Sequence, residues 1–169
     1  MTLSMYRMTV PVFQRGLATL NAYLDKAEAH ATEKALDPGM LVNARLAPDM
    51  LTLSGQFQRA SDTAKLTIAR LGAIDAPSFE DSETTIAELR ERVAKTAAFL
   101  ATIGEDTLAG SETRQVTISP GGVKMTFRGD DYLASFALPN FYFHIATAHA
   151  ILRQQGVAIG KRDYLGAFA

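Results

Sequence analysis

Apolar side chains recur every three or four residues along four stretches of the chain, which is the spacing of an amphipathic helix. The stretches run from about Met5 to His30, from about Pro48 to Gly72, from about Pro77 to Leu100 and from about Pro139 to Gly156. Their stripes consist of Phe13, Leu17, Leu20, Leu24 and Ala27; Met50, Leu53, Phe57, Ala60, Ala64, Ile68 and Leu71; Ile86, Leu89, Val93, Ala97 and Leu100; and Phe141, Ile145, Ala148 and Leu152. Four such stripes predict four helices around one core.

Local signals mark the expected ends of these helices. Pro48 suits the first turn of the second helix, because its missing N–H is not needed there, and Gly72 is a typical stop. The acidic cluster at 80–83 predicts that the third helix begins nearby, since negative charge stabilises a helix N-terminus. A separate turn at 132–136 is expected to precede the fourth helix.

Between the third and fourth helices the pattern changes from helical to alternating. Apolar residues alternate on both sides of a Pro120-Gly121-Gly122 turn, which predicts a β-hairpin within about Gln115–Arg128. Two strands are only marginally stable alone, so the hairpin is expected to pack on the bundle or on a partner chain, and we predict a homodimer. The fold class is therefore mainly all-α: an antiparallel up-down four-helix bundle with one small hairpin.

Composition narrows the range of functions. The 169 residues have the length of one domain, so we expect 1–169 to form a single bundle. Lys and Arg number 17 against 18 acidic residues, a balance that argues against nucleic-acid binding. No stretch approaches the roughly 20 apolar residues of a membrane span, and the first residues do not resemble a secretion signal. The chain has no cysteine, which excludes disulfides and thiolate ligands. We expect a cytoplasmic protein without membrane contact.

Five segments resemble a bacterial family of unknown function in the DinB-like, or YfiT-like, four-helix-bundle superfamily. They are KAEAHA at 26–31, ARLAPDM at 44–50, DTAK at 62–65, NFYFH at 140–144 and AILRQQGVAIGKRDYLG at 150–166. The resemblance implies the same bundle. It also implies a divalent metal held by three histidines, one on the second helix and two a turn apart on the fourth, and in some members a transferase or isomerase that uses an exogenous thiol. Only His144 matches that pattern, because the second helix has no histidine and residue 148 is alanine.

The chain has three histidines, and their spacing separates two of them. His144 and His149 are five residues apart, about 140° around a helix, so they are expected to point into different surroundings. His30 continues the inner edge of the first helix, and Asp49 and Gln56 share one flank of the second. A pocket that combines His30, His144 and an oxygen of Asp49 or Gln56 would suit zinc, nickel or manganese. The alternative is that these are buried polar groups bonded to one another, with Asp49 stabilising a helix N-terminus.

Other polar residues have simpler interpretations. Asp62 and Lys65 have the spacing of an exposed ion pair, and Tyr142 is expected at an interface between helices. The segment 161–165 either closes the mouth of a pocket or is a solvated tail pinned by Tyr164 and Leu165. Two functions remain open: a small-ligand-binding or structural bundle with a degenerate metal site, and a metal-dependent transferase or hydrolase that acts on a small molecule, with or without an exogenous thiol.

Overall fold

Four long helices form the body of the protein, as the stripes predicted. In the computed structural model, which describes residues 3–166, more than half of the residues are helical. The long helices are α1 (Val10–Lys34), α3 (Leu53–Gly72), α4 (Ile86–Ala101) and α6 (Leu138–Gln154). Most of the predicted stripe residues are fully buried, and Tyr23 and Tyr132 are the largest buried side chains. No helix within residues 3–166 is both long and apolar enough to cross a membrane.

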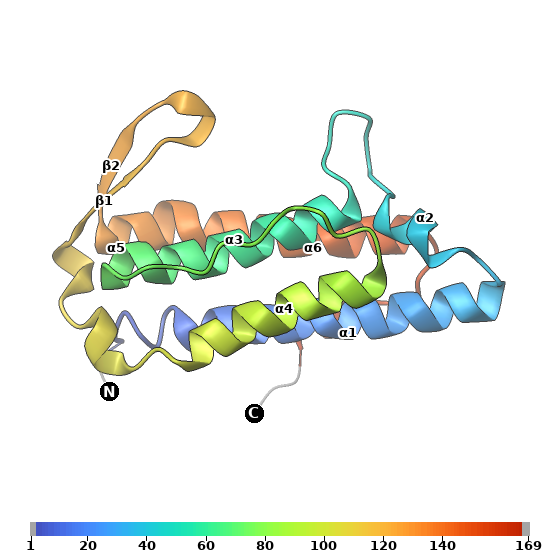
Figure 1. Cartoon of the computed structure of the whole chain (residues 1–169), viewed down its shortest axis with the longest axis horizontal. Coiled ribbons are helices and arrows are strands. Elements are labelled where there is room, and N and C mark those ends of the chain that lie inside the picture. The colour runs from blue at the N-terminus through green and yellow to red at the C-terminus, as the bar shows by residue number, and fades with distance from the viewer. Residues whose placement is uncertain (1–2, 167–169) are drawn as a thin grey trace.

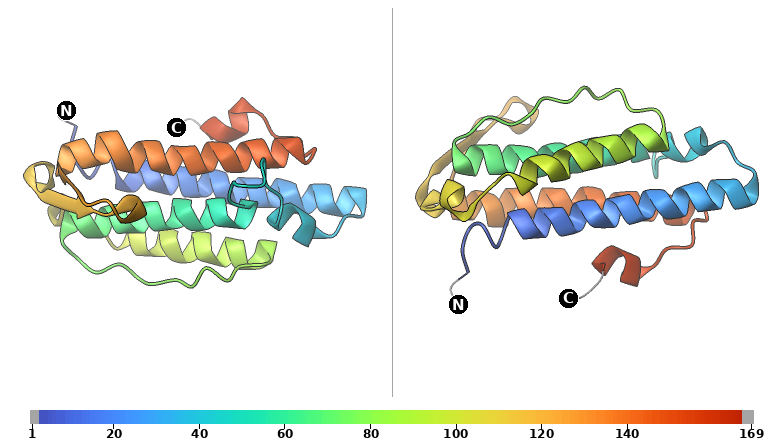
Figure 2. Two further views of the ribbon diagram at one scale, coloured as in Figure 1. Left: turned by 90° about the horizontal axis from the view of Figure 1, so that it is seen from above. Right: turned by 60° about the horizontal axis from the view of Figure 1, so that its bottom comes forward.

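The helices do not simply alternate in direction along the chain. α1 and α6 run the same way, since contacts advance along both, from Phe13 with Phe141 to Tyr23 with His149. α3 and α4 both run the opposite way (Figures 1 and 2). The order is therefore up-down-down-up, which corrects the predicted up-down alternation while leaving the four-helix bundle confirmed. The reason is the segment 73–85, which runs in an extended form along the length of the bundle and returns the chain to its starting end.

The acidic cluster lies in this crossover segment, so the predicted start of the third helix was too early. α4 begins at Ile86, where the Thr85 side chain accepts a hydrogen bond from Glu88 N at 3.2 Å, and Glu88 accepts one from Thr85 N at 2.9 Å. This reciprocal capping box satisfies two helix donors and fixes the helix start. α3 likewise begins after Thr52, which caps it by accepting from Gly55 N, rather than at Pro48.

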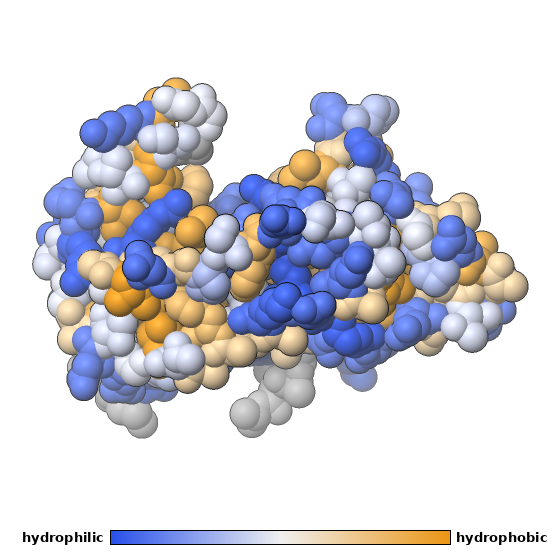
Figure 3. Space-filling view, viewed as in Figure 1, coloured by the Kyte–Doolittle hydropathy of each residue, from blue (hydrophilic) through white to orange (hydrophobic). Residues whose placement is uncertain are grey.

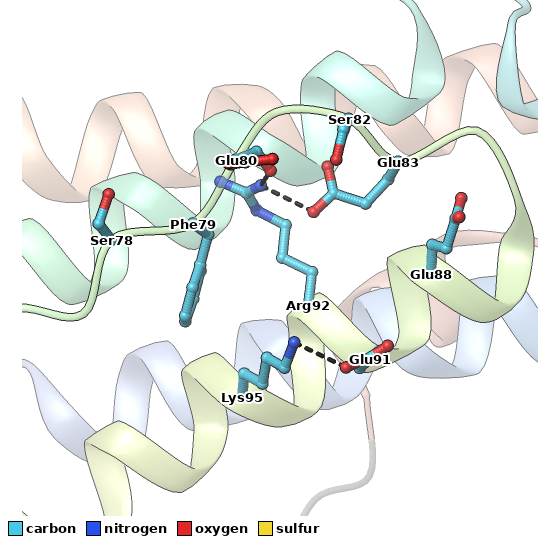
Figure 4. Close-up of a pocket in the computed structure, with 9 residues that line it drawn as sticks. All are labelled: Ser78, Phe79, Glu80, Ser82, Glu83, Glu88, Glu91, Arg92 and Lys95. Carbon is cyan, nitrogen blue, oxygen red and sulfur yellow. Dashed lines mark hydrogen bonds and ion pairs between the residues drawn. The ribbon is translucent and has the colours of Figure 1, made fainter.

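The crossover segment is fixed to the bundle by one buried arginine (Figure 4). Arg92 of α4 has a side chain 1% exposed, and its guanidinium contacts Glu83 at 2.8 Å and Asp81 at 3.0 Å on the crossover. The same guanidinium contacts Asp62 of α3 at 3.0 Å and lies over the ring of Phe79. Asp81 and Glu83 therefore neutralise a buried cation instead of a helix dipole.

Shorter elements complete the chain: α2 (Pro38–Val42), β1 (Gln115–Ile118), β2 (Met125–Arg128), α5 (Gly129–Tyr132) and α7 (Lys161–Leu165). The strands pair antiparallel within the predicted hairpin range, with Gln115 opposite Arg128. The expected separate turn at 132–136 is instead part of a continuous helix, in which a π-helical turn at Leu133–Ala137 joins α5 to α6. Pro139 lacks the N–H needed for the regular bond to residue 135, which accounts for the wider turn.

Two parts of the chain project from the same side of the bundle. Figure 3 shows them as two projections with a hollow between them, and Figure 1 identifies them as the hairpin and the segment 43–52. Val123 and Met125 on the hairpin and Leu46 and Leu51 on the other projection are exposed. In the view from above, both projections lie over α3 and α6 (Figure 2).

Candidate functional site

One hydrogen-bonded pair of predicted site residues lies between α3 and α6. His144 Nδ1 is 2.8 Å from Gln56 Oε1, and both side chains are buried. Gln56 is fixed in turn, because its Nε2 donates to the carbonyl of Leu51 at 3.2 Å. The amide oxygen can only accept, so this arrangement places the proton of the imidazole on Nδ1.

The other ring nitrogen of His144 is left as the functional atom. Within residues 3–166, every fully buried side-chain nitrogen or oxygen except Arg92 Nε has a hydrogen-bond partner. The hydrogen bond of His144 is made by Nδ1, so Nε2 keeps some exposure to solvent. Burial, together with the positive charge of Arg59, lowers the pKa of His144 to about 4. The imidazole is therefore neutral near pH 7 and presents an unprotonated Nε2, which is a hydrogen-bond acceptor.

The groups around this imidazole are both polar and apolar. Phe143, the preceding residue, is 57% exposed, and its ring packs edge-on against the His144 ring with centroids 5.4 Å apart. One turn earlier, Asn140 of α6 donates to the hydroxyl of Thr63 on α3 at 2.7 Å. The result is a fixed acceptor between α3 and α6 that has an exposed aromatic ring beside it.

The structure does not bring the other predicted ligands to this pair. His30 is half-buried near the end of α1, beside Gly156, which follows the C-terminal end of α6 and is far from His144. Asp49 is exposed in a turn that precedes the N-cap of α3. Within residues 3–166, no group of three or more histidine, aspartate or glutamate side chains is placed to hold a metal ion.

His149 faces α1 instead of α3, as its angular separation from His144 predicted. Its Nδ1 lies 2.9 Å from the hydroxyl of Tyr23, whose side chain is fully buried. Burial raises the pKa of Tyr23 well above its ordinary value, and burial also lowers the pKa of His149. Sequence reasoning missed this pair, although Tyr23 falls three residues after Leu20 in the first stripe and a buried hydroxyl requires a partner.

A cleft of about 390 Å³ lies between α1, α6 and α7. Its walls are made by Arg15, Gly16, Thr19, Tyr142, Ile145, Tyr164 and Leu165. The segment 161–165, for which closing a pocket was one of two interpretations, thus covers a cleft between helices. Lys26 of α1 holds this cover through an ion pair with Asp163 at 2.8 Å.

The pair Asp62 and Lys65 is not the exposed ion pair that the spacing predicted. The side chain of Lys65 is 6% exposed; its ammonium lies 3.0 Å from Asp62 and above the ring of Phe79. Asp62 also contacts Arg92, so these residues belong to the network that fixes the crossover. A second cleft lies beside that network, between 78–83 and α4 (Figure 4). Three of its glutamates are already engaged: Glu88 caps α4, and Glu83 and Glu91 form ion pairs.

Comparison with known proteins agrees with this architecture. A family described as "Domain of unknown function (DUF1993)" matches residues 5–165. A crystal structure of a DinB family member protein from Shewanella denitrificans is similar, with a TM-score of 0.91 and 44% sequence identity over 96% of this chain and 92% of that chain. No curated protein matches. The chain therefore belongs to the DUF1993 family of unknown function and has the fold of a DinB family member.

Proposed function

We propose that this protein binds a small ligand at His144, on the face between α3 and α6, and that the metal site of the wider superfamily is degenerate here. The observation that supports this is the fixed tautomer of His144, with Nδ1 held by Gln56 and Nε2 directed away from that bond. A ligand with a hydroxyl, amide or amine hydrogen would donate to Nε2. The edge-on Phe143 ring would contact an apolar part of the same ligand.

The residues at this site do not fit a catalytic metal. Catalytic zinc sites use three protein ligands, commonly histidines and carboxylates. Here His144 supplies one nitrogen, while the oxygen of Gln56 already accepts a hydrogen bond from that ring. A single monodentate ligand would hold a transition metal weakly, so we derive no reaction step through a metal.

Metal analysis tests the first half of the proposal. Protein purified without chelator or affinity tag is dialysed after exposure to zinc, nickel or manganese, and bound metal is measured by mass spectrometry. We expect well below one ion per chain. A stoichiometric metal that survives dialysis and is lost in His144→Ala would contradict the proposal and favour the metal-dependent transferase or hydrolase, to be assayed with an added low-molecular-weight thiol.

Ligand binding tests the second half. The chain is titrated with a panel of small alcohols, amides and anilines while the imidazole resonances of ¹³C-labelled histidine are followed by NMR. We expect binders that shift the His144 signals and are lost in His144→Ala but retained in the matched variant His149→Ala, because the two rings face different helices. Equal loss in both variants, or no response at His144, would show that the face between α3 and α6 is not the site.

A further inference from the structure

The two projections from the bundle, the hairpin β1–β2 and the segment 43–52, both carry exposed apolar side chains. Val123 and Met125 are exposed on the hairpin, and Leu46 and Leu51 are exposed on the segment 43–52. The two projections border one hollow on the same side of the molecule (Figure 3). Exposed apolar residues that gather in this way, instead of being scattered singly, are typical of an interaction surface.

The apolar face of the hairpin is covered on one strand only. Ile118 lies opposite Met125 and Val116 lies opposite Phe127, so these four side chains share one face of the two-stranded sheet. Val116 and Ile118 on β1 are buried, whereas Met125 on β2 is 41% exposed. Because two strands alone are only marginally stable, a further contact on the β2 side would stabilise the hairpin.

The positions of the two projections fit a two-fold symmetric contact. The hairpin stands at one end of the bundle, and the segment 43–52 stands farther along the same side, where it leads into α3 (Figure 1). Seen from above, the two lie nearly in line along the bundle (Figure 2). A two-fold axis that crosses the bundle at the hollow therefore places the hairpin of one copy beside the segment 43–52 of a second copy, and the reverse.

The charges on the two projections are complementary. On the hairpin, Arg128 pairs with Asp130 of its own chain at 3.2 Å, and Lys124 is exposed near the turn. On the segment 43–52, Arg45 donates to a main-chain carbonyl of the same segment at 3.3 Å, and Asp49 is exposed. An ammonium on one projection and a carboxylate on the other are thus available to meet across a contact, and such complementarity selects the partner and fixes the register.

We therefore infer that a second copy of this chain covers these surfaces, in a two-fold dimer in which each hairpin packs beside the segment 43–52 of the other copy. Lys124 pairs with Asp49 of the second copy, and Val123 and Met125 pack on its Leu46. A second copy fits because the surface that complements each projection lies on the chain itself. The symmetry forms every contact twice, so one substitution changes two contacts.

Charge reversal followed by sedimentation tests the dimer. The original protein should sediment as a dimer at micromolar concentration. Lys124→Glu and Asp49→Lys should each weaken the dimer at least about tenfold, because each creates two contacts between like charges. The double variant that combines them should recover an affinity within about threefold of the original, since both pairs are restored with reversed sign. Circular dichroism should show that all variants are folded, because both side chains are exposed.

Lys161→Glu is the matched control for the loss of positive charge. Lys161 is exposed on α7, which packs beside α1 and away from both projections (Figure 2). This variant should dimerise like the original protein. The inference is overturned if the original protein is only monomeric at micromolar concentration, if Lys161→Glu weakens the dimer as much as Lys124→Glu, or if the double variant is as weak as the single ones.

Cross-linking tests which surfaces meet. The chain has no cysteine, so Asp49→Cys and Lys124→Cys each introduce a single thiol. The two variants, one of them labelled with ¹⁵N, are mixed and treated with a short bismaleimide, and the products are identified by mass spectrometry. Mixed covalent dimers should exceed those of either variant alone, and Lys161→Cys mixed with Lys124→Cys should give few. Equal yields in all mixtures would overturn the inference. No ligand enters either experiment, so the outcome is independent of binding at His144.

Discussion

Replacing Arg92 by methionine should destabilise the protein more than any surface change, because Arg92 joins the crossover segment to two helices. The side chain is 1% exposed and contacts the carboxylates of Asp62, Asp81 and Glu83. Methionine fills much of the same volume but supplies no charge. Three carboxylates would then lack their shared cation in a partly dehydrated site, which is the costly way to break a buried ion pair.

The expected magnitude follows from how exposed these carboxylates are. Removing one partner of a buried pair typically costs about 3–5 kcal/mol. The side chain of Glu83 is 11% exposed, but those of Asp62 and Asp81 are 20% and 43% exposed, so water compensates part of the loss. We expect a decrease of about 3 kcal/mol in the free energy of unfolding at pH 7. For a domain of this size that lowers the melting temperature by roughly 6–12 °C.

The same substitution should change the pH dependence of stability. Burial raises the pKa of Glu83, but hydrogen bonds from Arg92 and Gln58 outweigh it, so the pKa lies below the ordinary 4.5. Glu83 therefore stabilises the original protein above about pH 4.5, and this contribution is lost as the pH falls through the folded pKa. Without Arg92, burial dominates and the pKa rises. As the pH falls, Glu83 is then protonated in the variant before it is protonated in the original protein, which removes an unpaired buried charge from the variant. The difference in the free energy of unfolding between the two proteins should therefore shrink as the pH falls from 7 towards 4.

Urea unfolding followed by circular dichroism at several pH values measures both effects. The matched control is Lys95→Met, on the same helix, whose ammonium pairs with Glu91 in an exposed position. That variant should lose less than about 0.5 kcal/mol. A loss below about 1 kcal/mol for Arg92→Met, or a difference that does not shrink at low pH, would refute the view that Arg92 fixes the crossover.

Four further outcomes are expected. Tyr23→Phe should cost about 1 kcal/mol in urea unfolding, because it leaves a histidine nitrogen without its partner. Gly16→Ala should cost about 1–3 kcal/mol or more by the same measurement, since an added Cβ would lie 2.3 Å from the Phe141 ring. Because the pKa of His144 falls from 6.5 to about 4 on folding, stability should decline as the pH drops from about 6.5 towards 4, and His144→Gln should remove that part of the decline. We also propose that the exposed hairpin Gln115–Arg128 contributes to a homodimer; sedimentation showing only monomer at micromolar concentration would contradict it.

The helices could be predicted because burial follows the helical period closely. Phe13, Leu17 and Leu20 are buried as their spacing required. The order of directions was missed because the acidic residues of 80–83 fit a helix N-terminus equally well. A signal was available in α4: Arg92 and Thr96 continue the core stripe from Leu89 by steps of three and four, and both are buried. An arginine in a core stripe requires carboxylates, which lie on 80–83.

The candidate site was predicted in part for a similar reason. Helical periodicity specifies the face on which a side chain lies, so Gln56 and His144 were correctly placed on facing helices. It does not specify how far one helix is shifted along the bundle axis relative to another. His30 lies on an inner edge of α1 but too far along the bundle, and Asp49 precedes the helix cap. These axial shifts depend on loop lengths and on packing between helices, which sequence spacing alone does not encode.

The difference from a three-histidine site extends to the packing around His144. The family resemblance implies a second histidine four residues later, where this chain has Ala148 with no exposed surface. A methyl group in the core of a bundle leaves no space for an imidazole unless neighbouring side chains move. On the facing helix, which has no histidine, Gln56 accepts a hydrogen bond from the ring of His144. Both changes favour one fixed, neutral imidazole over a chelating set, and this supports a binding role for His144 in which its free nitrogen accepts a hydrogen bond.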